Sequence, residues 1–227
     1  MENSNIIELK HVTKSFSDGF TAVDDFNLEV RRGEFVTFLG PSGCGKTTTL
    51  RMIAGFELPT SGEILLNGKS ITNLPPYERP INTVFQRYAL FPHMNIYENI
   101  AFGMRHKGKK EDEIQKTVTE MLHMVNLNGM AHRGVGQLSG GQQQRVAIAR
   151  ALANAPKVPL LAKPPSDPDS KPRQDIQNAL KKIQQAIGIT FISVTHAQEE
   201  SPSLSDTVAV MDTGQSQQTG SPPYIYY

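Results

Sequence analysis

The chain has 227 residues, 38% of them hydrophobic, and a formal net charge of +1 at pH 7. This composition predicts a globular protein with a sizeable core, in one large domain or two lobes. It offers no basic excess for nucleic acid and no stretch near the roughly 20 apolar residues of a membrane span. One cysteine excludes an internal disulfide framework and fits a reducing compartment. We expect no signal peptide, because residues 1–5 have neither a basic nor an apolar region.

The first third of the chain predicts mainly strands. Residues 6–12 and 22–30 alternate in part between apolar and polar side chains, and we expect them to form an antiparallel edge layer. Residues 34–39 are mostly apolar and predict a buried strand. Residues 62–66 and 83–85 are further short strand candidates. The buried strand leads directly into a glycine-rich segment.

That segment, residues 40–48, fits the phosphate-loop pattern G-x-x-x-x-G-K-[ST] at every fixed position. It is followed by a predicted helix start at residues 48–54, so backbone N–H groups and a helix dipole would converge on phosphate oxygens. We expect Lys46 to reach the β- and γ-phosphates and the Thr47 hydroxyl to ligate Mg²⁺. A glycine-rich turn without function would not need both flanking elements. The predicted nucleotide-binding residues are Gly40, Pro41, Ser42, Gly43, Cys44, Gly45, Lys46, Thr47 and Thr48.

Two amphipathic helices and another strand are predicted further on. Residues 111–126 and 174–187 carry apolar side chains at helical spacing, and the first of these segments begins with acidic residues. Residues 189–194 are β-branched and aromatic, which is typical of a buried strand. Strands separated by helices predict a parallel sheet. The apolar positions of the two helices are Ile114, Val118, Met121, Leu122, Val125, Ile176, Leu180, Ile183 and Ile187.

A second motif, Leu138-Ser139-Gly140-Gly141-Gln142, opens a predicted helix that continues through residue 152. A serine N-cap followed by two glycines at a helix N-terminus predicts a second anion site. An ordinary capped helix would not need the glycines, which weaken a helix start. With the phosphate loop, this motif resembles the LSGGQ signature of the ATP-binding subunits of ABC transporters.

The resemblance implies an α/β fold, with a phosphate-loop NTPase core around a mainly parallel sheet, an antiparallel β layer at its edge and an inserted helical lobe. Residues 1–86 and 155–227 would form the core and the β layer, and residues 87–154 the helical lobe that ends in the signature helix. The chain 1–227 is then a single ABC ATPase domain. Many relatives carry a further C-terminal regulatory domain, which we expect this chain to lack.

The resemblance also assigns roles outside the two motifs. Phe16 would stack on the adenine of ATP, with a core aromatic as the alternative. Gln86 would contact Mg²⁺ and His196 the γ-phosphate, and both are predicted catalytic residues. Asp169 is retained from the family's Ser-Ala-Leu-Asp loop and is a predicted nucleotide-binding residue. The signature residues would close over ATP held by a partner subunit, and they are Ser139, Gly140, Gly141 and Gln142.

The implied partners are proteins, and no nucleic acid is expected. A second ATPase subunit would form a head-to-tail dimer beneath transmembrane permease subunits, which in turn meet a solute-binding protein. The complex would lie at the cytoplasmic face of the bacterial inner membrane, with this subunit attached peripherally. Residues 87–94 are rich in large apolar groups and would receive a permease helix, unless they fill the core of the helical lobe. Residues 82–86 and 88–94 most resemble ATPase subunits of spermidine/putrescine importers, which favours polyamine transport.

The family pattern breaks after about residue 158. Ala162 stands where the family has an aspartate that helps to hold Mg²⁺, and Lys163 where it has a glutamate that positions or deprotonates water. Alanine cannot ligate a cation, and a protonated lysine cannot act as a general base. Pro159 lacks the N–H of a central strand and therefore disfavours one here.

Three explanations for this break are open: a hydrolysis-deficient variant, a degenerate regulator, or a misreading of the residues after 158. The scatter of the departures over residues 159–227 favours the third. Two function hypotheses follow, an ATP-hydrolysing importer subunit and a nucleotide-gated module that dimerises on ATP without hydrolysis. A soluble ABC protein of DNA repair or translation is disfavoured, because it would need long inserts or basic surfaces.

Overall fold

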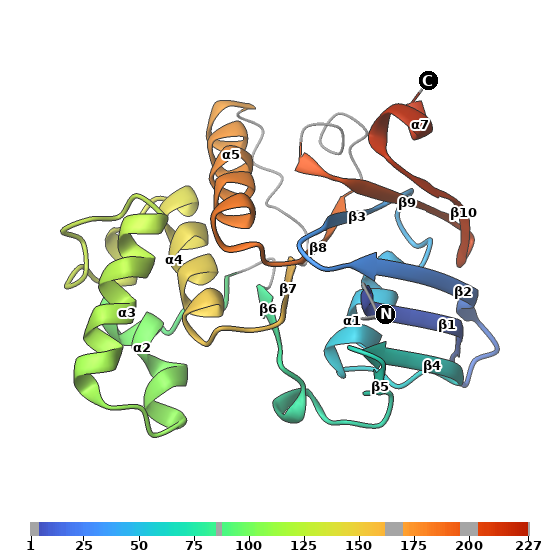
Figure 1. Ribbon diagram of the computed structural model, residues 1–227, viewed down its shortest axis with the longest axis horizontal. Coiled ribbons are helices and arrows are strands. Elements are labelled where there is room, and N and C mark those ends of the chain that lie inside the picture. The colour runs from blue at the N-terminus through green and yellow to red at the C-terminus, as the bar shows by residue number, and fades with distance from the viewer. Residues whose placement is uncertain (1–4, 85–87, 162–169, 196–203, 227) are drawn as a thin grey trace.

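The computed structural model describes residues 5–84, 88–161, 170–195 and 204–226. Two sheets lie on one side of the molecule and a group of helices on the other (Figure 1). Among the described residues, no helix is both long and apolar enough to cross a membrane.

The larger sheet has six strands in the order β10-β9-β3-β8-β7-β6. All neighbouring strands in it run parallel except β10, which is antiparallel to β9. The strand β3 lies inside the sheet, between β9 and β8, and its five residues are all buried. The strands are β3 (Phe35–Leu39), β6 (Ile81–Val84), β7 (Val158–Leu161), β8 (Phe191–Thr195), β9 (Thr207–Asp212) and β10 (Gln215–Gly220).

The smaller sheet is antiparallel and has the order β2-β1-β4-β5. It packs against helix α1 (Lys46–Ala54) and one face of the larger sheet through a shared cluster of buried side chains. In this cluster the rings of Phe26 and Phe38 meet edge to face, with centroids 6.0 Å apart. Its strands are β1 (Asn5–Ser15), β2 (Thr21–Arg31), β4 (Ser61–Leu66) and β5 (Lys69–Ser70).

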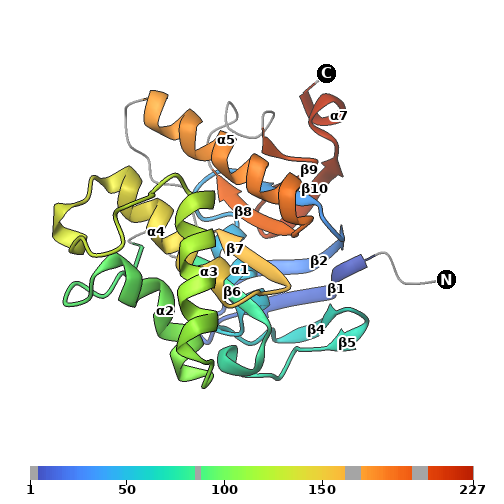
Figure 2. The same ribbon diagram turned by 60° about the vertical axis from the view of Figure 1, so that its left-hand side comes forward.

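A second cluster of buried side chains joins the helical group to the other face of the larger sheet. The period of two along β3 explains this, since Val36 and Phe38 belong to the first cluster and Phe35 to the second. Helix α5 lies over β8 (Figure 2) and contributes Leu180 and Ile183 to the second cluster. The remaining elements are α2 (Ile96–His106), α3 (Glu111–Met124), α4 (Gly140–Ala153), α5 (Ser170–Ile187), α7 (Pro222–Tyr226) and the short turns η1 (Pro76–Glu78) and η2 (Val135–Gln137).

The fold class is confirmed, because the structure has a mainly parallel sheet, an antiparallel layer and a helical group. Two expectations are wrong. Pro159 lies in β7, where it is paired with Asn82 of β6, while the pairing of β7 with β8 begins only at Leu160. Ile187 was expected on the apolar face of its helix, but as the last residue of α5 it is 49% exposed.

Candidate nucleotide site

Two glycines of the phosphate loop have no room for a side chain. A Cβ atom on Gly40 would lie 2.1 Å from the carbonyl oxygen of Met211 in β9. A Cβ atom on Gly45, whose φ is +98°, would lie 2.3 Å from the carbonyl oxygen of Ala22 in β2. Only glycine fits such close backbone approaches. The loop is therefore held between the two sheets, with residues 41–43 exposed.

Lys46 begins α1 and is only 2% exposed. Its ammonium donates to the carbonyl oxygens of Gly40 at 2.8 Å and Pro41 at 2.5 Å, and to Cys44 Sγ at 3.2 Å. All three acceptors are uncharged, so the desolvated cation is not neutralised by them. Phosphate oxygens would satisfy it better, because charge-assisted hydrogen bonds are the stronger ones. The buried lysine inside a glycine cradle therefore fits a phosphate group.

Phe16 lies on the turn between β1 and β2. The ring is 39% exposed, which argues against the core alternative. Lys14 Nζ lies 5.1 Å from the ring centroid and is itself held by Glu57 at 2.8 Å and by the Leu58 carbonyl at 2.8 Å. Stacking of adenine on Phe16 stays a prediction.

Four parallel strands end at one edge of the larger sheet. Leu39 of β3 is paired with Thr195 of β8, and Leu161 of β7 is paired with both Ser193 of β8 and Val84 of β6. Ligands of open α/β sheets collect at the carboxyl ends of parallel strands. The phosphate loop directly follows β3, so it lies at this edge.

Several predicted site residues follow the other three strand ends in sequence. Gln86 comes two residues after β6, Ala162 directly after β7 and His196 directly after β8. These residues, with Lys163 and Asp169, lie outside the described part of the chain, and their predicted roles are untested.

The signature motif forms a capped helix start. The Ser139 side chain accepts a hydrogen bond from the Gln142 N–H at 3.3 Å, and Gln142 Oε1 accepts one from the Ser139 N–H at 3.0 Å. This reciprocal capping box fixes the first turn of α4. Leu138 anchors the turn in the second cluster, while Ser139 and Gly140 stay exposed. An exposed helix N-terminus of this kind can receive an anion from outside the chain.

The phosphate loop and the signature motif belong to different parts of the chain's fold. The helix after the loop, α1, packs in the first cluster, and α4 packs in the second. Figure 1 shows them on opposite sides of β6 and β7. The signature motif therefore lies apart from the phosphate loop of its own chain.

A pocket of about 370 Å³ lies among β6, α2, α4 and the segment before α2. Its wall includes Phe91, Phe102 and Arg150, with the two phenyl centroids 4.6 Å apart. Asn154 also lines it, and its buried Oδ1 atom has no partner among the described residues. The pocket thus offers an aromatic wall, a cation and an unpaired acceptor.

The comparisons with known proteins fit this geometry. A profile of ABC transporter proteins matches residues 23–165. The chain belongs to the ABC transporter family. It is 56% identical over 222 residues to the spermidine/putrescine import ATP-binding protein PotA of Clostridioides difficile, covering 98% of this chain and 64% of that protein. It is 55% identical over 225 residues to the protein of the same name from Bacteroides thetaiotaomicron, covering 99% of this chain and 48% of that protein. The chain thus spans less than two thirds of either relative's length.

Solved structures of ABC transporter proteins share the fold. The cbiO1 protein of Clostridium perfringens, part of the ABC transporter complex cbiONQ, matches with a TM-score of 0.93 and 31% identity, covering 99% of this chain and 91% of that one. The ATP-binding cassette MJ0796, solved as a dimer in a post-hydrolysis state with ADP and Pi, matches with a TM-score of 0.81 and 33% identity, covering 95% of this chain and 98% of that one. Both structures are more than 30% identical in sequence to this chain, so the likeness extends beyond the fold to the family.

Sequence reasoning missed the residues that support this ABC transporter site. Lys14, Asn99 and Arg150 each hold another segment through contacts distant in sequence. Arg150 lies inside the helix predicted after the signature motif, but no helix was predicted over residues 96–106, which hold the buried Asn99.

Proposed function

We propose that this chain is the ATP-binding subunit of an ABC importer and that it holds ATP with Mg²⁺ at the phosphate loop. The observation that carries this proposal is Lys46, buried in a glycine cradle at the edge where four parallel strands end. Family membership supports the nucleotide, since the cradle and the strand edge match what a triphosphate needs.

The residues present fit the nucleotide and its metal. Lys46 would pair with the β- and γ-phosphates, and Thr47, exposed on the first turn of α1, would ligate Mg²⁺. When bound, the Mg²⁺ would neutralise phosphate charge. Phe16 would take the adenine on its open face. Gln86 and His196 retain their predicted roles at the metal and the γ-phosphate.

The second anion site needs a second chain. The capped N-terminus of α4 is exposed, and it belongs to a different cluster from the phosphate loop. We infer that Ser139, Gly140, Gly141 and Gln142 close over ATP held by a partner subunit, in a head-to-tail dimer. The dimeric structure of the similar cassette MJ0796 supports a paired arrangement. In this proposal residues 1–86 and 155–227 form the nucleotide-binding core and residues 87–154 the helical lobe.

The pocket beside Arg150 is the proposed docking site for a transmembrane permease subunit. It lies where residues 88–91 run between β6 and α2, the segment expected to meet a permease helix. Phe91 and Phe102 would pack against an apolar side chain of that helix. In this proposal the chain lies peripherally at the cytoplasmic face of a membrane, with a solute-binding protein further from it.

Polyamines are the proposed cargo. The two relatives reported above are both spermidine/putrescine import proteins at 55% identity or more over nearly all of this chain. The ATPase need not touch the cargo, so the support is the likeness itself. Transport of labelled spermidine by vesicles with this chain and its permease subunits would test it. Uptake of another solute class in its place would contradict it.

The rival proposal keeps ATP binding and dimerisation but removes hydrolysis. It is favoured by one observation, Ala162 and Lys163 in place of the expected aspartate and glutamate. Peptide mapping of residues 156–227, together with an intact mass, distinguishes a true substitution from a misread sequence.

A titration of the purified chain with ATP and Mg²⁺ tests the nucleotide proposal itself. Lys46→Ala should weaken binding by roughly 10- to 100-fold, because one charge-assisted contact is lost. The exposed Lys116, on the outer part of α3, provides the control Lys116→Ala. Equal ATP affinity of the wild type and Lys46→Ala would contradict the assignment of the phosphate loop.

A further inference from the structure

Arg150 joins the end of the signature helix to the segment that enters the pocket. Its Nη1 atom donates to the Ala89 carbonyl at 2.8 Å, and its Nη2 atom donates to the Tyr88 carbonyl at 2.9 Å. A planar guanidinium presents its two Nη donors in a fixed fork that matches these carbonyls, whereas a lysine ammonium has no such fixed geometry. Burial lowers the pKa of Arg150, which nevertheless stays protonated at neutral pH.

The two residues that Arg150 holds are in an unfavourable backbone conformation. Tyr88 has φ of 58° and Ala89 has φ of 46°, both in the left-handed region. Each such non-glycine residue costs on the order of 1–3 kcal/mol and persists only where its surroundings hold it. The segment therefore has a ready alternative conformation if the guanidinium contact is lost.

The other end of the segment is fixed to α2. Asn99, which is fully buried, accepts a hydrogen bond from the Phe91 N–H at 2.9 Å and donates to the Phe91 carbonyl at 3.2 Å. The Arg150 guanidinium carbon lies 5.2 Å from the centroid of the Phe91 ring, in cation–π contact. One side of the segment is thus held by α2 and the other by α4.

We propose that Arg150 is a positioning residue that makes residues 88–91 and α4 move as one unit. Residue 150 lies eleven positions after Ser139 in α4, roughly 16 Å along the helix axis. Because α4 is a continuous helix, a tilt of residues 88–91 that moves Arg150 also moves the signature motif. A partner seated against Phe91 then favours one orientation of α4. By reciprocity, closure of the signature motif on nucleotide strengthens that docking. This inference rests on the proposed function.

The first test needs neither nucleotide nor partner. Amide hydrogen exchange should show the Phe91 N–H and its neighbours exchanging at least about 10-fold faster in Arg150→Lys than in the wild type. The matched control is Arg145→Lys, on the same helix, whose Nη1 atom instead reaches the Val125 carbonyl at 3.5 Å. Adding Ala89→Gly to Arg150→Lys should restore part of the protection, because glycine adopts a positive φ without strain. Unchanged exchange near residue 91 in Arg150→Lys would overturn the inference.

The second test measures the coupling itself. The ATP concentration for half-maximal dimer closure is measured with and without saturating permease subunits, using a fluorescent pair on the two chains. In the wild type and Arg145→Lys the permease should lower this concentration, and in Arg150→Lys the ratio should fall to near one. An undiminished ratio in Arg150→Lys would overturn the inference while leaving the proposed function intact. Absence of ATP-driven closure in the wild type would instead contradict the proposed function.

Discussion

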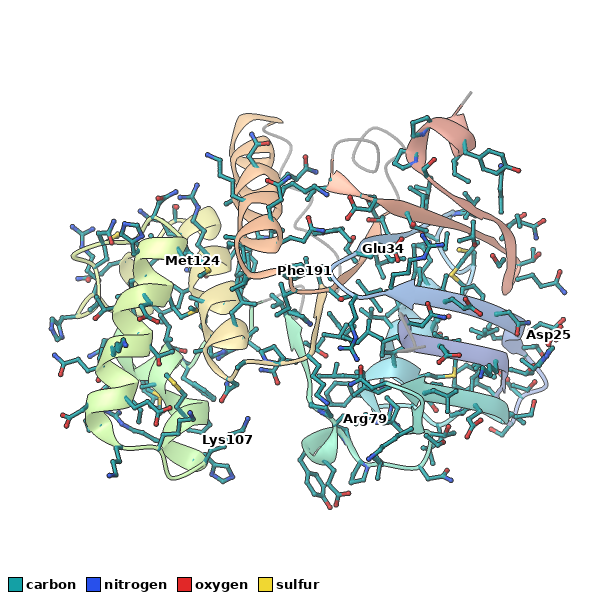
Figure 3. All side chains as sticks on the ribbon, viewed as in Figure 1. Asp25, Glu34, Arg79, Lys107, Met124 and Phe191 are labelled. Atoms are coloured by element: carbon teal, nitrogen blue, oxygen red, sulfur yellow. The ribbon has the colours of Figure 1, made fainter. Side chains whose placement is uncertain are left out.

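The guanidinium of Arg79 occupies the space beside Gly55 at the end of the phosphate-loop helix. A Cβ atom on Gly55 would lie 2.6 Å from Arg79 Nε, and Gly55 itself has φ of +85°. Arg79 donates to the carbonyls of Met52 at 2.6 Å and Ile53 at 2.8 Å, which are the last turn of α1. It also donates to the carbonyls of Thr72 and Leu74, and it is only 4% exposed. Figure 3 labels Arg79 among the side chains drawn as sticks. A buried cation thus satisfies the terminal carbonyls of the helix that carries Lys46.

Gly55→Ala should therefore destabilise the fold more than the same change at Gly108. Both glycines have a positive φ, but a Cβ atom on Gly108 would have nothing within 4 Å. The backbone strain of the two variants is similar, and the contact with the fixed guanidinium adds about 2 kcal/mol to the first. Chemical denaturation gives both free energies of unfolding. Equal losses of unfolding free energy in the two variants would contradict this, because they would show that the Arg79 guanidinium moves away from the new methyl group without cost.

Arg79→Met should cost about 3 kcal/mol of stability, because two buried and two partly buried carbonyls lose their donor at once. Arg79→Lys should recover only part of this loss, since one ammonium cannot reach carbonyls on both sides. The measurement is again the free energy of unfolding. A loss below about 0.5 kcal/mol in Arg79→Met would mean that water replaces the guanidinium without cost.

Asp206 should make the free energy of unfolding of the protein fall at acid pH. Burial raises the pKa of this carboxyl, but hydrogen bonds from Lys181, the Phe35 N–H and Gln184 hold the pKa below its ordinary value overall. A lowered folded pKa means that the unfolded chain binds protons first as the pH falls. The stabilisation is therefore fully present above about pH 5 and is lost as the pH falls through the folded pKa. The stability difference between wild type and Asp206→Asn should shrink as the pH falls from about 5 to 3. A difference independent of pH would contradict this account.

The elements that carry a strong local pattern could be predicted from the sequence. The phosphate loop has glycines at fixed spacing, and the signature motif has a capping residue three positions before its glutamine, so a helix was predicted after each, although α1 begins two residues earlier than expected, at Lys46. Arg79 and Arg150 could not be found, because their partners are backbone carbonyls that only the tertiary fold brings near. The prediction that Pro159 disfavours a strand was wrong for the same reason. The strand preference of a single residue does not show which neighbouring strands it pairs with in the sheet. The prediction for Ile187 was wrong because helical spacing does not show how far along the helix the packing against the sheet extends.

The substitutions at residues 162 and 163 predict a specific defect. If the chain carries Ala162 and Lys163, it should bind ATP yet hydrolyse it at a small fraction of a family-like rate, because a general base alone contributes about 10²–10⁴-fold. Ala162→Asp with Lys163→Glu should raise turnover by orders of magnitude, and either change alone should do little, since such residues act as a unit. Phosphate release under saturating ATP measures this. Brisk hydrolysis by a chain whose peptide map confirms both residues would refute the prediction.

The trans arrangement predicts different defects for the two motifs. Gly141→Asp should leave ATP binding by the monomer within about twofold of the wild type, because in the proposed dimer the signature motif serves the partner's nucleotide. It should block ATP-driven dimerisation, since a carboxylate at the start of α4 would repel the partner's γ-phosphate. Nucleotide titration and size-exclusion chromatography give the two readouts. Loss of monomer affinity would place the signature motif in the chain's own site.

One measurement tests the central claim, that each nucleotide is held between Lys46 of one chain and the signature motif of another. The Lys46→Ala and Gly141→Asp variants are purified separately and then mixed with ATP and Mg²⁺. Light scattering gives the molar mass of each variant alone and of the mixture. Neither variant should dimerise alone, whereas the mixture should form a heterodimer, because the phosphate loop of the second variant and the signature motif of the first make one intact site. A mixture that stays monomeric while the wild type dimerises, or a dimer formed by either variant alone, would contradict the account.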